Sequence, residues 1–278
     1  MASNLSTIGF AFTDDAAFEE TMVKLANSSQ HRLVTPQGDY AIWRSRTGAE
    51  VWFHLAPRDD GGDERDIVGL TPFFEGESHV AVAVTEAFQR PGDNPLEGLV
   101  HAWVAPDGSG IGSYPVVIEA VDYAAQAARQ LPADLSFRIS GFCRELKVYP
   151  SAAAMTAADT DADGAKLAPE SFVPIGLFAD GNGSANDSDD TPAPTNGAVS
   201  EPDNDDDATP MPTALIRGSV MSHRKLVNEV TGHAFHAMLV RTLDATLDLV
   251  VDDDIVTTEP KFGTSIEAYA WLFGRAIV

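Results

Sequence analysis

Apolar and polar residues alternate over much of this chain, and the pattern predicts a protein built mainly from strands. The first alternating stretch, Leu5–Phe12, places Ile8, Phe10 and Phe12 on one side and therefore predicts a strand. The residues after it have apolar positions three and four apart, and Asp14 before them is a favourable N-cap. A helix is expected directly after the first strand.

Two more alternating stretches follow the expected helix. Tyr40–Arg46 and Glu50–Leu55 predict strands, and Thr47 and Gly48 between them favour a tight hairpin turn. The first 55 residues are thus expected in the order strand, helix, strand, strand.

Most of the chain from there to residue 178 predicts further strands, separated by polar segments rich in glycine and proline. The expected strands are Asp66–Phe74, His79–Phe88, Leu99–Val104, Tyr114–Tyr123 and Leu135–Tyr149. Short helices are expected at Ala124–Leu131 and Ser151–Ala158, and Ser171–Phe178 is expected to pack on a core as an apolar segment.

Residues 180–212 contain nine acidic residues but no lysine, arginine or aromatic residue. Such a segment cannot bury enough apolar surface to offset the entropy of ordering its backbone, so it predicts a disordered acidic linker. The linker divides the chain into a strand-rich α+β domain, residues 1–178, and a C-terminal module, residues 213–278. The module is expected to fold as a small β-barrel, with strands at Ala214–Val220, His233–Asp244, Thr246–Asp252 and Ser265–Val278 and a polar arm at Met221–Asn228.

Acidic residues outnumber lysine and arginine by 42 to 18, which gives a formal net charge of −24. A surface this negative repels phosphate backbones at long range, so nucleic acid is not expected as a partner. No stretch is long and apolar enough to span a bilayer, and the N-terminus lacks the pattern of a signal peptide. We therefore expect a cytoplasmic protein without membrane contact. Cys143 is the single cysteine, which excludes a disulfide within the chain.

The helix after the first strand, the strand carrying Tyr40–Trp43 and the run TGAEVWF together resemble one module of the vicinal oxygen chelate superfamily, which includes glyoxalase and bleomycin-resistance proteins. The resemblance covers Ile8–Leu55. It implies an α+β fold and, in the enzymes of that superfamily, a metal ion held by His, Glu or Gln from fixed strands. The first expected strand, LSTIGFAF, contains none of these residue types, so no metal ligand is assigned from the resemblance.

The C-terminal module is similar to an OB-type barrel. The similarity rests on a G-x-V strand at Gly218 and Val220, a hairpin from Asn228 to Asp252 and a closing AYAWLFGR strand. OB folds often bind oligonucleotides or oligosaccharides, so the similarity implies a binding role for the module.

Five residues on expected strands are candidates for a binding surface, namely Trp52, His54, His79, His101 and Trp103. A metal or acid–base site would need two or three of Glu50, His54, His79, His101 and Glu119 to converge in space. No metal, cofactor or catalytic residue is predicted. His233 and His236 form an H-x-x-H spacing on an expected strand, where they would face opposite sides, so they are interpreted as structural.

No complete catalytic motif occurs in the sequence. We therefore expect a homo-oligomeric, non-catalytic protein that binds a small molecule or a protein partner. Two alternatives remain open. One is a metal-dependent lyase, isomerase or dioxygenase of the vicinal oxygen chelate type, and the other is binding of single-stranded nucleic acid by the C-terminal barrel.

Overall fold

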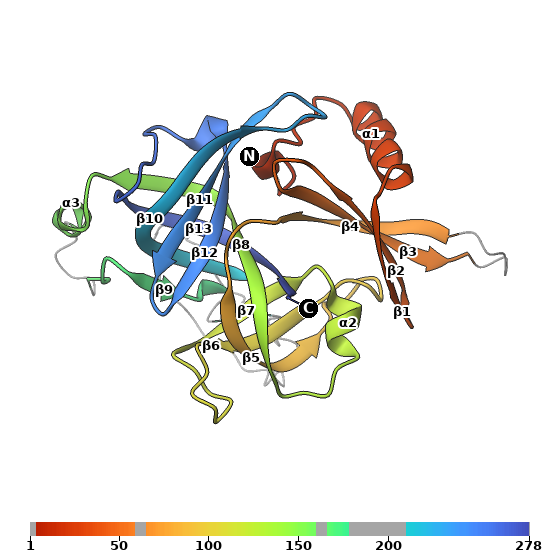
Figure 1. The fold of residues 1–278 in the computed structure, drawn as a ribbon, viewed down its shortest axis with the longest axis horizontal. Helices are drawn as coiled ribbons and strands as arrows, with labels where there is room; N and C mark the ends of the chain where they lie inside the picture. Colours follow the sequence, from red (N-terminus) through yellow and green to blue (C-terminus); the bar gives the residue numbers. More distant parts are fainter. Residues whose placement is uncertain (1–3, 59–64, 160–165, 178–209, 278) are drawn as a thin grey trace, which may run out of the picture.

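Strands dominate the fold, and they form two sheets that can be followed in Figure 1. The structure, a computed structural model, describes residues 4–58, 65–159, 166–177 and 210–277. An antiparallel sheet of β1 to β4 stands beside a nine-stranded mixed sheet formed by β5 to β13. The expected strand-rich α+β class is confirmed. The expected linker, 180–212, lies outside the described residues except for positions 210–212.

The N-terminal segment forms a 3-10 turn, η1 (Ser6–Ile8), where the alternation predicts a strand. Gly9 ends the turn with a φ of 83°. Two side chains from a distant hairpin bind its backbone: Asn228 Nδ2 donates to the carbonyl of Ile8 at 3.0 Å, and Thr231 Oγ1 donates to that of Gly9. The strand prediction is wrong because these tertiary contacts, instead of a neighbouring strand, satisfy the carbonyls.

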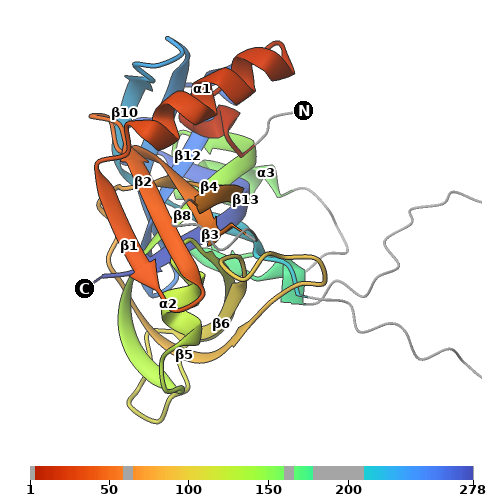
Figure 2. The same cartoon turned by 90° about the vertical axis from the view of Figure 1, so that its right-hand side faces the viewer.

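Helix α1 (Asp15–Asn27) confirms the helix expected after this segment. Asp14 is its N-cap, and its carboxylate accepts a hydrogen bond from the N–H of Ala17 at 2.8 Å. Met22 and Leu25 are buried in the core shared with the four-stranded sheet. Figure 2 shows α1 crossing this sheet near one end of β1 and β2.

The four-stranded sheet is an antiparallel meander. Its strands are β1 (His31–Thr35), β2 (Gly38–Arg44), β3 (Ala49–Pro57) and β4 (Arg65–Phe74). The expected hairpin between β2 and β3 is confirmed, while β1 is an additional strand that the sequence pattern does not predict. The order after η1 is therefore helix followed by four strands.

The other elements follow in chain order. They are β5 (Val80–Phe88), β6 (Leu99–Val104), β7 (Tyr114–Ala120), α2 (Tyr123–Ala127), β8 (Ala133–Tyr149), α3 (Ala152–Ala158), β9 (Ser171–Val173), η2 (Ile175–Leu177), β10 (Thr213–Val227), β11 (Ala234–Thr242), β12 (Ala245–Asp252), η3 (Asp253–Ile255) and β13 (Ser265–Ala276). The expected strands and short helices of this part are confirmed in type. Strand β10 also includes most of the segment predicted as a polar arm, because it pairs with β11 as far as Val227.

The long strands β8 and β13 pair antiparallel along nearly their whole length and form a central ribbon. Two closed rings of five strands share this ribbon. One ring runs β8, β12, β11, β10, β13, and the other runs β8, β5, β6, β7, β13. Few residue pairs close each ring: three join β12 to β8, and two join β7 to β13.

The strands of residues 213–278 therefore do not close on themselves, as the expected OB-like barrel would require. Strand β8, from the N-terminal part of the chain, pairs with both β12 and β13 and completes their ring. The physical reason is that these four strands lie in the Greek-key order β13, β10, β11, β12, which leaves one unpaired edge on β13 and one on β12, and β8 satisfies the backbone groups of both.

Consecutive side chains of a strand point to opposite faces, so the ribbon and the strands beside it contribute to two separate hydrophobic cores. Leu249 and Leu272 point into the shared interior of the rings, while their neighbours Val250 and Phe273 belong to a second core between the rings and the four-stranded sheet. All four are at most 1% exposed. Strands β12 and β13 are thus apolar on both faces at this level.

A partly buried ionic cluster also joins the sheet to the ribbon. Glu75, directly after β4, forms an ion pair with Arg138 Nε at 2.8 Å and accepts a hydrogen bond from Arg275 Nε at 3.0 Å. Arg138 lies on β8 and Arg275 on β13, so one carboxylate links the end of the four-stranded sheet to both strands of the ribbon.

Candidate ligand-binding site

The candidate site lies where two strands, β5 and β12, pair with consecutive parts of the same edge of β8. Strand β5 pairs with the first part of that edge, with Val80 opposite Phe137. Strand β12 pairs with a later part, with Asp248 opposite Ser140 in parallel register. Continuing that register would place Ala245 opposite Phe137, a position that β5 already occupies. The start of β12 must therefore leave β8 and diverge from β5.

A buried carboxylate fixes the point of divergence. Asp248 accepts the backbone N–H groups of Glu77 at 3.0 Å and Ser78 at 2.7 Å. The hydroxyl of Ser78 in turn donates to the carbonyl of Ile139 on β8 at 2.9 Å. Burial raises the pKa of Asp248, and these N–H donors act in the opposite direction. A Cβ on Gly76 would lie 2.1 Å from Cγ of Asp248, so only glycine fits at that position.

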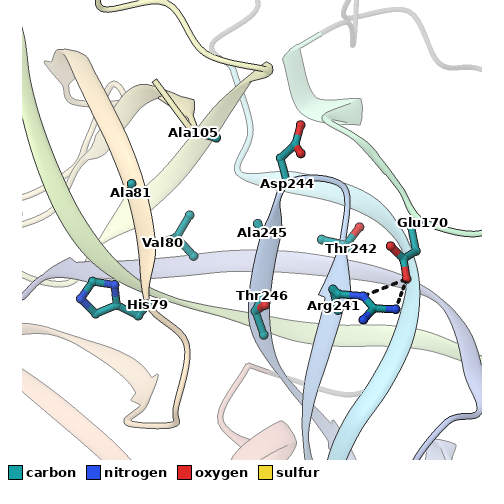
Figure 3. Close-up of a pocket in the computed structure, with 10 residues that line it drawn as sticks. All are labelled: His79, Val80, Ala81, Ala105, Glu170, Arg241, Thr242, Asp244, Ala245 and Thr246. Carbon is teal, nitrogen blue, oxygen red and sulfur yellow. Dashed lines mark hydrogen bonds and ion pairs between the residues drawn. The ribbon is translucent and has the colours of Figure 1, made fainter. Parts of the chain in front are cut away.

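Between the diverging strands lies a cavity of about 460 Å³, drawn in Figure 3. Its aliphatic lining comes from Val80 and Ala81 on β5, Ala105 after β6, and Ala245 on β12. These side chains carry no polar atom and supply the apolar part of a lining that is otherwise polar.

The rim of the cavity carries both signs of charge. Arg241 at the end of β11 donates from Nε and Nη2 to Oε1 of Glu170, at 3.1 and 2.9 Å. Asp244 is exposed in the two-residue turn between β11 and β12, with a φ of 48° that aspartate tolerates better than most residues. Figure 3 shows His79 on the β5 side, opposite Arg241 and Glu170, with Thr246 between them.

Of the five binding candidates expected from the sequence, His79 is the one that lines this cavity. His54 lies in the four-stranded sheet and is fully buried. Its Nδ1 is 3.1 Å from Oε1 of Glu97 and its Nε2 is 3.2 Å from Oγ1 of Thr71. Burial would raise the pKa of Glu97, but hydrogen bonds from His54 and Asn94 hold it below its usual value. Both ring nitrogens of His54 therefore have partners within the protein.

The remaining candidates also have local partners. Trp52 is buried and donates from Nε1 to Glu50 at 2.8 Å, so it is not part of an exposed aromatic surface. His101 is half-buried, with Nδ1 2.7 Å from Oγ1 of Thr85, and burial lowers the pKa of its imidazole. Trp103 is half-buried on β6, in a different sheet from Trp52.

The residues proposed for a convergent metal site do not form one cluster. Burial raises the pKa of Glu50, which pairs with Arg44. Glu119 accepts from Trp271 Nε1 at 2.8 Å and lies near Arg90, so each of these two carboxylates has its own partners. Within the described ranges, no group of three or more His, Cys, Asp or Glu side chains is placed to hold a metal ion.

The two histidines of the H-x-x-H spacing are separated as expected. His236 is buried, with Nε2 2.7 Å from Oδ1 of Asp253 and Nδ1 2.8 Å from Nε2 of His223. His233 is exposed before β11. The partner of His236 is thus His223, from the segment predicted as a polar arm, and the sequence spacing carries no signal for that pair.

Sequence reasoning did not single out Glu170, Arg241, Asp244 or Thr246 as site residues. The turn at Leu243–Asp244 is a local signal for the end of a hairpin, but the cavity depends on β5, which is far away along the chain.

No known protein family, characterised protein or solved structure matches this chain. None of the described helices is long and apolar enough to cross a membrane. The arrangement at the cavity therefore has to be interpreted from its own chemistry.

Proposed function

We propose that this protein is a non-catalytic binding protein that holds a small zwitterionic molecule between β5 and β12. The supporting observation is a cavity of about 460 Å³ with an aliphatic lining and a rim that carries a guanidinium and two carboxylates. A cavity of this size suits a small molecule, since ligand pockets of proteins have volumes of roughly 300–1,000 Å³.

The charges on the rim define how such a ligand would bind. Arg241 uses Nε and Nη2 for Glu170, which leaves Nη1 as a donor for a ligand carboxylate. Oε2 of Glu170 and the exposed carboxylate of Asp244 would accept hydrogen bonds from a ligand ammonium. An α-amino acid carries both groups within a few bonds, so free amino acids are the ligand class that we propose.

The test is ligand-observed NMR with alanine, lysine and glutamate. Each amino acid is compared with its N-acetyl and methyl-ester derivatives, which each lose one charge. We expect saturation transfer to the amino acids and at least about tenfold weaker binding of the derivatives, because a charge-assisted hydrogen bond is worth roughly 1.5–3 kcal/mol.

Arg241→Gln should weaken amino-acid binding by at least about tenfold. Asp244→Asn should weaken it as well, and asparagine keeps the left-handed turn. Arg129→Gln is the control, since Arg129 is an exposed arginine outside the cavity. Equal binding by the Arg241 and Arg129 variants would refute the proposal, as would one tight equivalent of a transition metal in the purified protein. The expected homo-oligomer stays a prediction, which light scattering after gel filtration would test.

A further inference from the structure

A second cavity lies on the face of the four-stranded sheet that α1 covers only in part. Its volume is about 570 Å³, and the last turn of α1 closes one side of it. Figure 2 shows why it exists: α1 crosses one end of β1 and β2, and the strands continue beyond the helix. The sheet therefore presents side chains on this face that no helix covers.

The floor of this cavity is apolar. Leu55 on β3 pairs with Ile67 on β4, and Ala41 lies two residues from the β2 partner of Leu55, so all three share one face of the sheet. Ile67 is 46% exposed. Val34 on β1 pairs with Asp39 on this same face and is 70% exposed. An exposed apolar patch of this kind is a common mark of a binding surface.

The rim of the cavity is basic. Arg32 and Arg65 line it from the two edge strands, β1 and β4, and both approach the same carboxylate oxygen of Asp39, with Nη2 distances of 2.7 and 3.8 Å. Asp39 is buried and compensates one of the two positive charges. None of the described residues that line the cavity is acidic, although acidic residues exceed basic ones by 42 to 18 in the whole chain.

We infer that this cavity binds a carboxylate with an apolar tail, such as a medium-chain fatty acid. The two guanidiniums would bind the carboxylate, since arginine presents donors in a fixed fork that matches it. The tail would lie on Leu55, Ile67 and Ala41 and remove them from water. The site is separate from the cavity between β5 and β12, so the inference does not depend on the proposed function.

The probe is octanoate, and binding is followed by isothermal titration and by amide chemical shifts of the full-length protein. Acetate lacks the tail, and octanol lacks the charge. We expect each to bind at least about tenfold more weakly than octanoate, and the shifts caused by octanoate to map to β1, β3 and β4. Shifts confined to β5 and β12 would instead assign octanoate to the first cavity and overturn this inference alone.

Arg65→Gln is the first variant, because Arg65 is the more distant of the two arginines from Asp39 and its removal leaves the Arg32 pair in place. It should weaken octanoate binding by about tenfold. The double variant Arg32→Gln with Asp39→Asn removes one guanidinium from the rim at unchanged net charge and leaves no buried carboxylate unpaired. It should also weaken octanoate binding, because one of the two donor groups for the carboxylate is lost.

Arg58→Gln is the matched control, since Arg58 lies on the same hairpin and pairs with Asp66 outside the cavity. Its octanoate affinity should change by less than about twofold. Equal affinity for octanoate and acetate, or an unchanged affinity in both rim variants, would overturn the inference.

Discussion

Asp122 and Gln126 form a buried pair whose hydrogen bonding depends on whether the carboxyl group of Asp122 is protonated. Gln126 Nε2 donates to Oδ2 of Asp122 at 2.6 Å. Oδ1 of Asp122 and Oε1 of Gln126 are also buried, and within the described part of the chain neither has a hydrogen-bond donor. One proton on Oδ1 would satisfy both oxygens, because the acid could then donate to the amide carbonyl while it accepts from the amide N–H.

Burial raises the pKa of Asp122 to about 6, from 3.8 for an unperturbed side chain. Because the folded-state pKa is raised, the neutral carboxyl contributes its full stability below pH 3.8, and the contribution is lost as the pH rises through about 6. The full loss is about 3 kcal/mol, since each pKa unit corresponds to about 1.4 kcal/mol. Between pH 4.5 and 7.5 the loss from this group alone is about 2 kcal/mol.

The perturbation that tests this is Asp122→Asn, which keeps the paired geometry and cannot ionise. The free energy of unfolding is measured by chemical denaturation for the wild type and the variant at pH 4.5 and 7.5. The wild type should lose about 2 kcal/mol more than the variant between these pH values, because the titration of other groups cancels in the comparison.

Asp134→Asn is the control, since Asp134 is exposed. It should keep the pH dependence of the wild type. If the Asp122 and Asp134 variants showed the same pH dependence as the wild type, the neutral acid–amide pair would be refuted.

Two further predictions concern buried positions near the ribbon. Gly76→Ala should destabilise the protein by about 2 kcal/mol or more, because the new methyl group would displace the buried carboxylate of Asp248 from its N–H donors. Thermal unfolding measures this effect, and backbone strain does not contribute to it, since the φ of Gly76 lies outside the left-handed region. Cys143 should react with a thiol reagent only after unfolding, because burial raises the pKa of its thiol to about 12. Rapid modification of the native protein at neutral pH would contradict the burial of Cys143.

The local elements were largely predictable because their signals are local. Helix α1 follows from its N-cap Asp14 and the spacing of its apolar residues, and the hairpin of β2 and β3 follows from alternation around Thr47–Gly48. Leu5–Phe12 shows the limit of this reasoning. Its alternation is real, yet Asn228 and Thr231 bind its carbonyls and it forms a 3-10 turn.

The sequence by itself determined the strand-rich class, because alternation at period two records which side of each strand is buried. It also determined the acidic surface and the position of the acidic segment. Only the tertiary structure decided how the strands join. The pairing of β8 with β12 and β13 connects residues more than one hundred positions apart, and no local pattern records which unpaired edge a strand will meet. The cavity between β5 and β12 depends on such a pairing, so its residues could be assigned only after the sheets were known. The second cavity instead lies on consecutive strands between residues 26 and 67, and one of its sides is the strand β1 that the sequence pattern does not predict.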